Sequence, residues 1–292
     1  MDLQEAYAKC THLAQSHYEN FPVGRLVPAA IRPHVHAIYA FARVADDLAD
    51  EGYVATDKHT PPSPEERTEL LLQYEAQLTA SLNGQFLDPK TEWIFLPLAD
   101  TAKKFNIPSQ LFYDLLSAFR QDVLKRRYAT FSEVLDYCRR SANPVGRLVL
   151  HLHHRTDPVE YQLSDEICTG LQLANFWQDV SVDLLKDRIY IPEEDMQAFG
   201  FSEADLFKKE PTLAIRKCTE FQVNRTWKIF EKGRDLSKKL PRSLGFEIRL
   251  TWLGGTTILR KIARQKYDTL SRRPKINKWD IMRLLLYAWF VR

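Results

Sequence analysis

The sequence has little glycine and few of the alternating apolar runs that β-strands need. Ten glycines occur in 292 residues, while segments with the 3.6-residue apolar period of α-helices dominate the chain. Internal repeats and low-complexity tracts are missing too. We therefore predict one all-α domain over residues 1–292. The expected helices cover 3–19, 32–51, 64–83, 89–105, 108–122, 130–153, 157–187, 202–207, 211–238, 243–268 and 277–290.

Paired cysteines, a leader and a membrane span are also lacking. The four cysteines are scattered without a C-x-x-C pair, so neither a zinc site nor a disulfide framework is expected, and a cytoplasmic location fits. The first residues, MDLQEAYAKC, do not resemble a leader, and no run of 18 apolar residues occurs. The apolar tail at 281–291 is expected to be a packed terminal helix. Peripheral contact with the inner face of the membrane is the alternative.

Charge of one sign is not in large excess. The formal net charge is +3 and the pI about 8.5, which is too mild to indicate a nucleic-acid partner. Basic clusters at 125–127, 139–140 and 272–273 are expected on solvated faces or at helix ends. No G-x-G-x-x-G motif follows a strand, so no nicotinamide cofactor is expected.

A polar stripe is present in residues 170–192, GLQLANFWQDVSVDLLKDRIYIP. On an α-helix, Gln172, Asn175, Asp179 and Asp183 lie within roughly 80° of one another. Two aspartates one turn apart repel by about 0.2–0.5 kcal/mol, and by more when they are buried. A hard cation with oxygen ligands would relieve this repulsion. A solvated acidic face is the alternative.

A second acidic cluster closes the helix expected over 33–51, PHVHAIYAFARVADDLADE. Its acids stand at the electronegative end of the helix, where acids are disfavoured. They are Asp46, Asp47, Asp50 and Glu51. Neutralisation by Arg43 at the surface is one explanation. The repetition of the pattern in two apolar helices favours another, a shared site.

If the two helices face each other across a cavity, five oxygen-bearing side chains converge. Magnesium typically bridges a few carboxylates to substrate phosphates, and it makes diphosphate a better leaving group. Aromatic faces stabilise a carbocation. The residues thus indicate ionisation of an allylic or cyclopropylcarbinyl diphosphate. The five side chains are Asp46, Asp50, Asn175, Asp179 and Asp183.

Residues 143–144, Asn-Pro, interrupt an otherwise helical run. Proline removes a backbone donor and disfavours helical geometry at Asn143. The break makes room for a ligand, or it is a plain kink between two helices.

The segments YAFARVADDLADE and LQLANFWQDVSVDLLKDRIYIP resemble the motifs of the squalene/phytoene synthases. The resemblance extends from His17 to about Arg273. It implies an all-α isoprenoid synthase fold with helices around a central apolar cavity, and Mg²⁺-dependent head-to-head synthesis from isoprenoid diphosphates.

The resemblance also implies roles for individual residues. Asp46 and Asp50 would form one metal cluster, and Asn175, Asp179 and Asp183 the other. The side chains expected to contact the diphosphate or the substrate are Arg43, Gln172 and Tyr267. Those expected to line or close the site are His17, Tyr39, Tyr137 and Arg188.

Within this family, SHYENFPVGRL, YCRRSANPVGRLVLHL and NFWQDVSVD are most similar to the bacterial hopanoid-pathway branch, the hydroxysqualene synthases. The implied reaction converts presqualene diphosphate to hydroxysqualene, releases diphosphate and captures the rearranged cation with water. A companion synthase would supply presqualene diphosphate.

The chain departs from the family pattern at positions where the resemblance implies diphosphate contacts. Tyr18, Glu19 and Asn20 stand where the family often has Ser and Lys, and Gln178 stands where many members have Arg. We interpret the missing cations as adaptation to a substrate with one diphosphate. Gln178 becomes a candidate for placing the water, together with Asn143, Tyr18 and Asn20.

Two other function classes stay open. A transferase could condense two farnesyl or geranylgeranyl diphosphates to squalene, dehydrosqualene or phytoene. A non-catalytic assembly factor of the same fold would have degraded clusters, whereas this chain retains all five expected ligands.

Overall fold

The computed structural model describes residues 1–16, 27–50 and 62–290. Helices account for the regular structure of these described residues, and no strand occurs among them. This confirms the predicted all-α class. Among the described residues no helix is both long and apolar enough to cross a membrane.

The chain groups into two compact units, which are described separately. Unit 1 comprises residues 1–124 and 147–156, and unit 2 comprises 125–146 and 157–292. One domain over 1–292, with helices around a central cavity, stays a prediction. Helices of unit 1 are α1 (Leu3–Ser16), α2 (Arg32–Asp50), α3 (Pro64–Leu82), α4 (Glu92–Lys104) and α5 (Gln110–Leu124). The boundary falls within α7 (Asn143–Leu152).

Helices of unit 2 are α6 (Phe131–Ser141), α8 (Pro158–Asp183), η1 (Leu184–Lys186), α9 (Glu193–Ala198), α10 (Glu203–Phe207), α11 (Leu213–Gly233), α12 (Leu236–Lys239), α13 (Arg242–Arg264) and α14 (Lys278–Phe290). The helix expected over 130–153 is thus two helices, which meet beside Asn143 as the Asn-Pro break indicates. The sequence did not predict α9, a six-residue helix with little periodicity to detect.

The core of unit 1 holds α2 in place through aromatic contacts. The Phe41 ring stacks on Tyr74 at 5.5 Å and meets Phe112 edge-on at 5.5 Å. The Tyr74 hydroxyl donates to the Phe41 carbonyl at 3.1 Å, so a buried polar group is satisfied while it fixes the helix. These contacts fix the middle of α2 in the core of unit 1.

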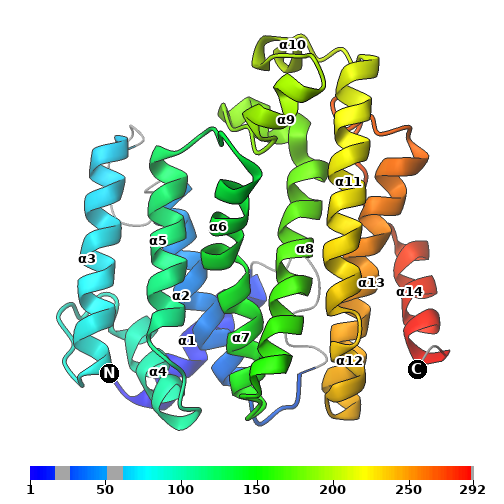
Figure 1. The fold of residues 1–292 in the computed structure, drawn as a ribbon. Helices are drawn as coiled ribbons and strands as arrows, with labels where there is room; N and C mark the ends of the chain where they lie inside the picture. Colours follow the sequence, from blue (N-terminus) through cyan, green and yellow to red (C-terminus); the bar gives the residue numbers. More distant parts are fainter. Residues whose placement is uncertain (17–26, 51–61, 291–292) are drawn as a thin grey trace. The chain divides into compact units, whose positions relative to one another are not determined.

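In unit 2, α8, α11 and α13 pack against one another (Figure 1). Phe230 of α11 packs against Gly170 of α8 and Gly255 of α13. A Cβ atom added at Gly170 would lie 2.9 Å from the Phe230 ring, and one at Gly255 would lie 2.5 Å from it. Only glycine fits at these two positions. Trp177 adds a buried hydrogen bond from its indole to the Thr226 hydroxyl at 2.8 Å.

Candidate active site in two aspartate clusters

The polar stripe follows one side of α8, as predicted. Along it, Asn175 is exposed, Gln172 and Asp183 are half-buried, and Asp179 is 9% exposed. The opposite faces carry buried apolar side chains, because residues three and four apart share a helix face. The helix thus presents two carboxylates and an amide in its last turns.

Arg273 binds Asp179 with a two-pronged contact. Its Nε donates to Oδ1 at 2.5 Å and its Nη2 donates to Oδ2 at 3.0 Å. This bidentate geometry is the strong form of the arginine–carboxylate pair, and Asp179 raises the pKa of Arg273. The sequence analysis expected the basic pair at 272–273 on a solvated face or at a helix end, and Arg273 is exposed, but its contact with Asp179 was not predicted. Its only signal was the cationic pair at 272–273.

Gln178 anchors the same segment. Its Nε2 donates to the Pro274 carbonyl oxygen at 2.7 Å. The chain after α13 is therefore tied to the end of α8 at two adjacent positions. Placement of a water by Gln178 stays a prediction, and its amide nitrogen is engaged with the backbone in this structure.

Asp183 carries a perturbed carboxyl group. Burial, followed by the nearby charge of Asp179, raises its pKa from 3.8 to about 7, while Arg188, Lys186 and Arg273 act in the opposite direction. The stripe therefore holds two neighbouring carboxyl groups, and the partly buried site of Asp183 disfavours its charged form. A hard divalent cation prefers oxygen ligands and would favour the charged form of Asp183, so this donor set fits magnesium.

No group of three His, Cys, Asp or Glu side chains within the described part of the chain is close enough to enclose a metal ion. Asp179 is held by Arg273 in this structure, and Asn175 stands on the exposed side of the helix. The ligand assignment stays a prediction.

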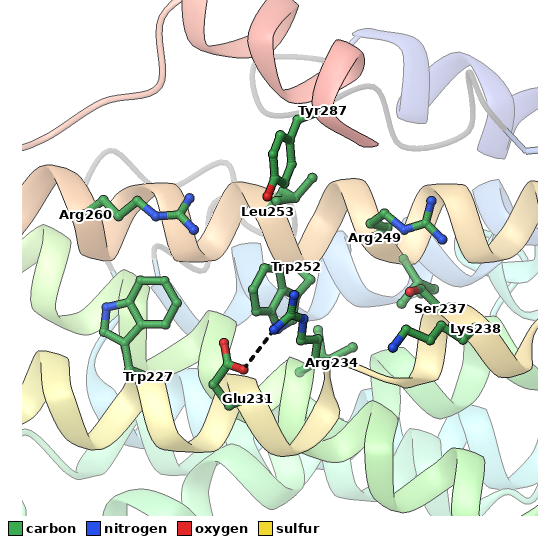
Figure 2. A pocket seen from close by; sticks show the side chains of 12 residues that line it. Trp227, Glu231, Arg234, Ser237, Lys238, Arg249, Trp252, Leu253, Arg260 and Tyr287 are labelled. Carbon is green, nitrogen blue, oxygen red and sulfur yellow. Dashed lines mark ion pairs between the residues drawn. The ribbon is translucent and has the colours of Figure 1, made fainter. Parts of the chain in front are cut away.

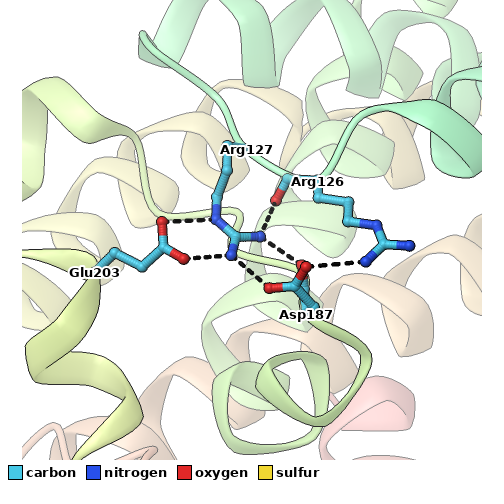
Figure 3. A network of polar contacts seen from close by, with 4 residues as sticks. All are labelled: Arg126, Arg127, Asp187 and Glu203. Carbon is cyan, nitrogen blue, oxygen red and sulfur yellow. Dashed lines mark hydrogen bonds and ion pairs between the residues drawn. The ribbon is translucent and has the colours of Figure 1, made fainter.

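The segment after α8 positions Arg188. Asp187 adopts a left-handed conformation (φ 57°), and the Arg188 amide donates to the Asp183 carbonyl oxygen at 2.9 Å. Asp187 also accepts from Arg126 at 2.9 Å and from Arg127 at 2.6 Å. Arg127 in turn donates to Glu203 at 2.9 Å, which completes the network in Figure 3. These contacts fix the turn that carries Arg188.

Tyr137 belongs to an aromatic cluster beside α8. Its ring lies 5.9 Å from Phe176 and 6.2 Å from Tyr190, and the last two stack at 3.7 Å. Tyr128 closes the cluster at 5.6 Å from Tyr190. The sequence analysis assigned no site role to Phe176 or Tyr190. Aromatic faces of this kind exclude water and attract cations.

Asn143 and Tyr267 both have protein partners. The Thr169 hydroxyl donates to Asn143 Oδ1 at 2.9 Å, which ties the start of α7 to α8. The Tyr267 side chain hydrogen-bonds Glu220 of α11, and burial together with this neighbour raises its pKa. A contact between Tyr267 and the diphosphate stays a prediction.

The first cluster, in unit 1, is more open. Arg43 lies 2.5 Å from an Asp47 oxygen and 3.6 Å from an Asp46 oxygen. The Asp46 side chain is 45% exposed and that of Asp47 21%. The expected surface neutralisation by Arg43 therefore occurs, and a metal-binding role for Asp46 stays a prediction.

Fewer structural details are described for the other predicted site residues of unit 1. Tyr39 is half-buried on α2. Asp50 ends the helix, but its side chain lies outside the described structure, as do His17, Tyr18, Glu19, Asn20 and Glu51.

An all-α chain with aspartate clusters at the ends of two helices fits the class of metal-dependent isoprenoid synthases. The squalene/phytoene synthase family profile matches residues 13–280. The chain is 32% identical to hydroxysqualene synthase from Zymomonas mobilis, with 92% of this chain and 86% of the relative covered. It is 33% identical to hydroxysqualene synthase from Rhodopseudomonas palustris, with 87% and 82% covered.

Comparison with solved structures supports the same family. The crystal structure of squalene synthase HpnC from Alicyclobacillus acidocaldarius matches with a TM-score of 0.82 and 37% identity, covering 91% of this chain and 96% of that one. The chain therefore belongs to the squalene/phytoene synthase family. This confirms the predicted family and the predicted enzyme class, an isoprenoid synthase of the head-to-head type.

Proposed function

We propose that the protein converts presqualene diphosphate to hydroxysqualene and diphosphate, with Mg²⁺ as its metal. The observation that carries this proposal is the Asp179–Asp183 pair on α8, where burial, followed by the charge of Asp179, raises the pKa of Asp183 to about 7. Full-length similarity to hydroxysqualene synthases supports the choice of substrate. Gln178, bound to the backbone of Pro274, stands where a diphosphate-binding cation is common in the family.

Both clusters would act on the same diphosphate. Asn175, Asp179 and Asp183 would hold metal from unit 2, and Asp46 and Asp50 from unit 1. A metal held by these residues would neutralise charge on the departing diphosphate. Support for joint action comes from the paired sequence motifs and from family membership.

The protein's own residues would supply orientation and shelter. Arg273 holds the Asp179 carboxylate in one orientation through its two hydrogen bonds. Tyr137, Phe176 and Tyr190 would keep water from the cation and stabilise it through their ring faces. The carbon–oxygen bond to diphosphate breaks, water oxygen bonds to the rearranged cation, and one proton leaves to solvent.

The wider setting follows from this chemistry. A companion synthase would supply presqualene diphosphate in the cytoplasm. No nicotinamide cofactor is needed, because water rather than hydride ends the reaction, and no nucleic-acid partner is expected.

Product analysis tests the proposal. The purified protein is incubated with presqualene diphosphate and Mg²⁺ in ¹⁸O-labelled water, with and without NADPH. We expect hydroxysqualene with one ¹⁸O atom in both cases. A parallel incubation uses farnesyl diphosphate alone. Efficient condensation of farnesyl diphosphate would overturn the proposal in favour of the transferase, and inactivity on both substrates would favour the assembly factor.

A further inference from the structure

Helix α14 (Lys278–Phe290) exposes an unusual amount of apolar surface. Seven of the nineteen exposed large apolar side chains in the described part of the chain lie on this 13-residue helix. Trp279 is 72% exposed and Trp289 is 66% exposed. Concentrated apolar exposure marks an interaction surface rather than ordinary scatter. The seven side chains are Trp279, Ile281, Met282, Leu285, Leu286, Tyr287 and Trp289.

The helix is nevertheless firmly seated on α13. Leu284 and Ala288 are buried, and Arg249 Nη1 donates to the Ala288 carbonyl oxygen at 2.9 Å. At the other end, Lys261 pairs with Asp280 at 2.6 Å. These contacts fix which face of α14 is turned outward.

Cation-lined cavities lie along α14. Three cavities, of about 210, 560 and 1190 Å³, each include side chains of this helix in their walls. The smallest lies among α11, α12, α13 and Tyr287 of α14 (Figure 2). The three walls together contain eight cations and two acids, Glu231 and Asp280. The cations are Arg234, Lys238, Arg242, Arg249, Arg260, Lys261, Arg264 and Arg283.

Several of these cations are available to an outside anion. Arg242, Arg264 and Arg283 are exposed. Arg260 lies over the Trp227 ring at 5.3 Å, an arrangement that leaves the guanidinium edge for hydrogen bonds. The cavities therefore offer positive groups next to an apolar helix face.

Charge is strongly segregated toward this end of the chain. Residues 234–292 contain 15 Lys and Arg against 4 Asp and Glu, a formal charge of +11, whereas the whole chain carries +3. Two copies meeting at this surface would bring like charges together, which disfavours self-association. The α14 surface is complemented by a partner that presents anionic and apolar groups within a few ångströms of each other. A lipid bilayer has this composition.

We propose that α14 and its three cavities form a docking surface for a bilayer that contains anionic lipid. The outward apolar side chains enter the boundary between headgroups and acyl chains. Trp279, Tyr287 and Trp289 are of the aromatic types that favour this interface. Arg242, Arg264 and Arg283 contact lipid phosphates. The inference goes beyond the proposed function and does not depend on it.

Vesicle flotation tests the contribution of the exposed apolar side chains of α14. The full chain is mixed with phosphatidylcholine vesicles, with or without about 30% phosphatidylglycerol. We expect the wild type to float with the anionic vesicles, and the Trp279→Glu/Leu286→Glu double variant to lose at least about tenfold in binding. Leu213→Glu, at another exposed apolar position (69%), should bind like the wild type. Circular dichroism and thermal melting check that each variant folds.

A second pair of variants tests the contribution of the basic side chains. Arg264→Gln/Arg283→Gln should weaken binding to anionic vesicles by about tenfold, and about 0.5 M salt should weaken wild-type binding similarly. Lys217→Gln/Lys228→Gln removes two exposed cations of α11 as the control. Failure of the wild type to float would overturn the proposal, as would unchanged binding in either α14-surface double variant. A concentration-dependent dimer abolished by Trp279→Glu/Leu286→Glu would assign the surface to a second copy instead.

Discussion

The two aspartate clusters are neutralised in different ways. On α2, Arg43 reaches Asp46 and Asp47 from one turn earlier on the same helix, and the acids remain partly exposed. On α8, Asp179 is buried and its cation, Arg273, comes from 94 residues further along the chain. The first arrangement is local and open to water, while the second depends on the packing of unit 2.

This difference has an energetic consequence. Exposed pairs such as Arg43–Asp46 contribute about 0–1 kcal/mol because water screens them. A buried carboxylate that loses its partner costs several kcal/mol. Removing the partner of Asp179 should therefore cost more folding stability than removing the partner of Asp46.

The largest effect is expected for Asp179→Asn. Loss of one carboxylate from the proposed metal site should reduce Mg²⁺-dependent diphosphate release from presqualene diphosphate by about a thousandfold. Phosphate released after pyrophosphatase treatment gives the rate. Glu166→Gln serves as control, because Glu166 lies on the same helix and pairs only loosely with Lys232 at 3.5 Å. Activity of Asp179→Asn within threefold of wild type would refute the ligand assignment.

Asp46→Asn should reduce the same rate by about a hundredfold. Asp47→Asn is its matched control, since Asp47 holds Arg43 more closely but is not a proposed ligand. We expect Asp47→Asn to retain activity within about fivefold, as for other exposed ion pairs. Equal losses in the two variants would show that the open cluster acts through its total charge rather than through a specific ligand.

Asp183→Asn should stabilise the metal-free protein at alkaline pH. The folded pKa, about 7, exceeds the ordinary value of 3.8, so the stability associated with protonated Asp183 is lost as pH rises between these values. Removing the charge should raise the free energy of unfolding by about 2 kcal/mol at pH 8, and by almost nothing near pH 4.

Chemical denaturation in a chelator at both pH values measures this effect. Asp187→Asn is the control of opposite sign, because Arg127 and Arg126 hold the pKa of exposed Asp187 below its usual value. It should lower stability at pH 8. A destabilised Asp183→Asn protein at pH 8 would mean that the charged carboxylate is well accommodated in the fold.

A smaller effect is expected for Arg273→Gln. Loss of the bidentate contact frees the Asp179 carboxylate to rotate, which should lower kcat/KM by about tenfold. Arg273→Lys should recover little, since an ammonium group cannot make the two-pronged contact. The neighbouring variant Arg272→Gln is the control, and its kcat/KM should change by less than about twofold. If Arg272 and Arg273 variants behave alike, the Asp179 contact has no role in turnover.

The helices and both acidic clusters could be predicted from the sequence because their signals are local. Apolar periodicity gave α2 and the start of α8 to within one residue, whereas α8 ends four residues before the predicted end and is followed by η1. The Asn-Pro pair marked the break at Asn143. The polar stripe from Gln172 to Asp183 followed from helical geometry alone.

Arg273 and the Phe176–Tyr190 stack could not be predicted in this way. Arg273 follows α13 in a segment without regular structure, and its partner Asp179 is distant in sequence. Tyr190 stacks on Phe176 although the end of α8 and the left-handed residue Asp187 lie between them in the sequence. The apolar sequence of α14 favoured a packed helix over a surface contact, and the sequence alone did not decide which of its side chains are exposed. These features depend on which elements meet in three dimensions.

The joint action of the two clusters is tested most directly by a double-mutant cycle on binding. The Mg²⁺-dependent affinity for farnesyl thiodiphosphate, which resists ionisation, is measured calorimetrically for wild type, Asp46→Asn, Asp179→Asn and the double variant. If both clusters bind one metal–diphosphate group, the double variant should lose little more affinity than Asp179→Asn alone. If the fold-loss in affinity of the double variant equals the product of the fold-losses of the two single variants, the clusters act independently. That result would contradict the account.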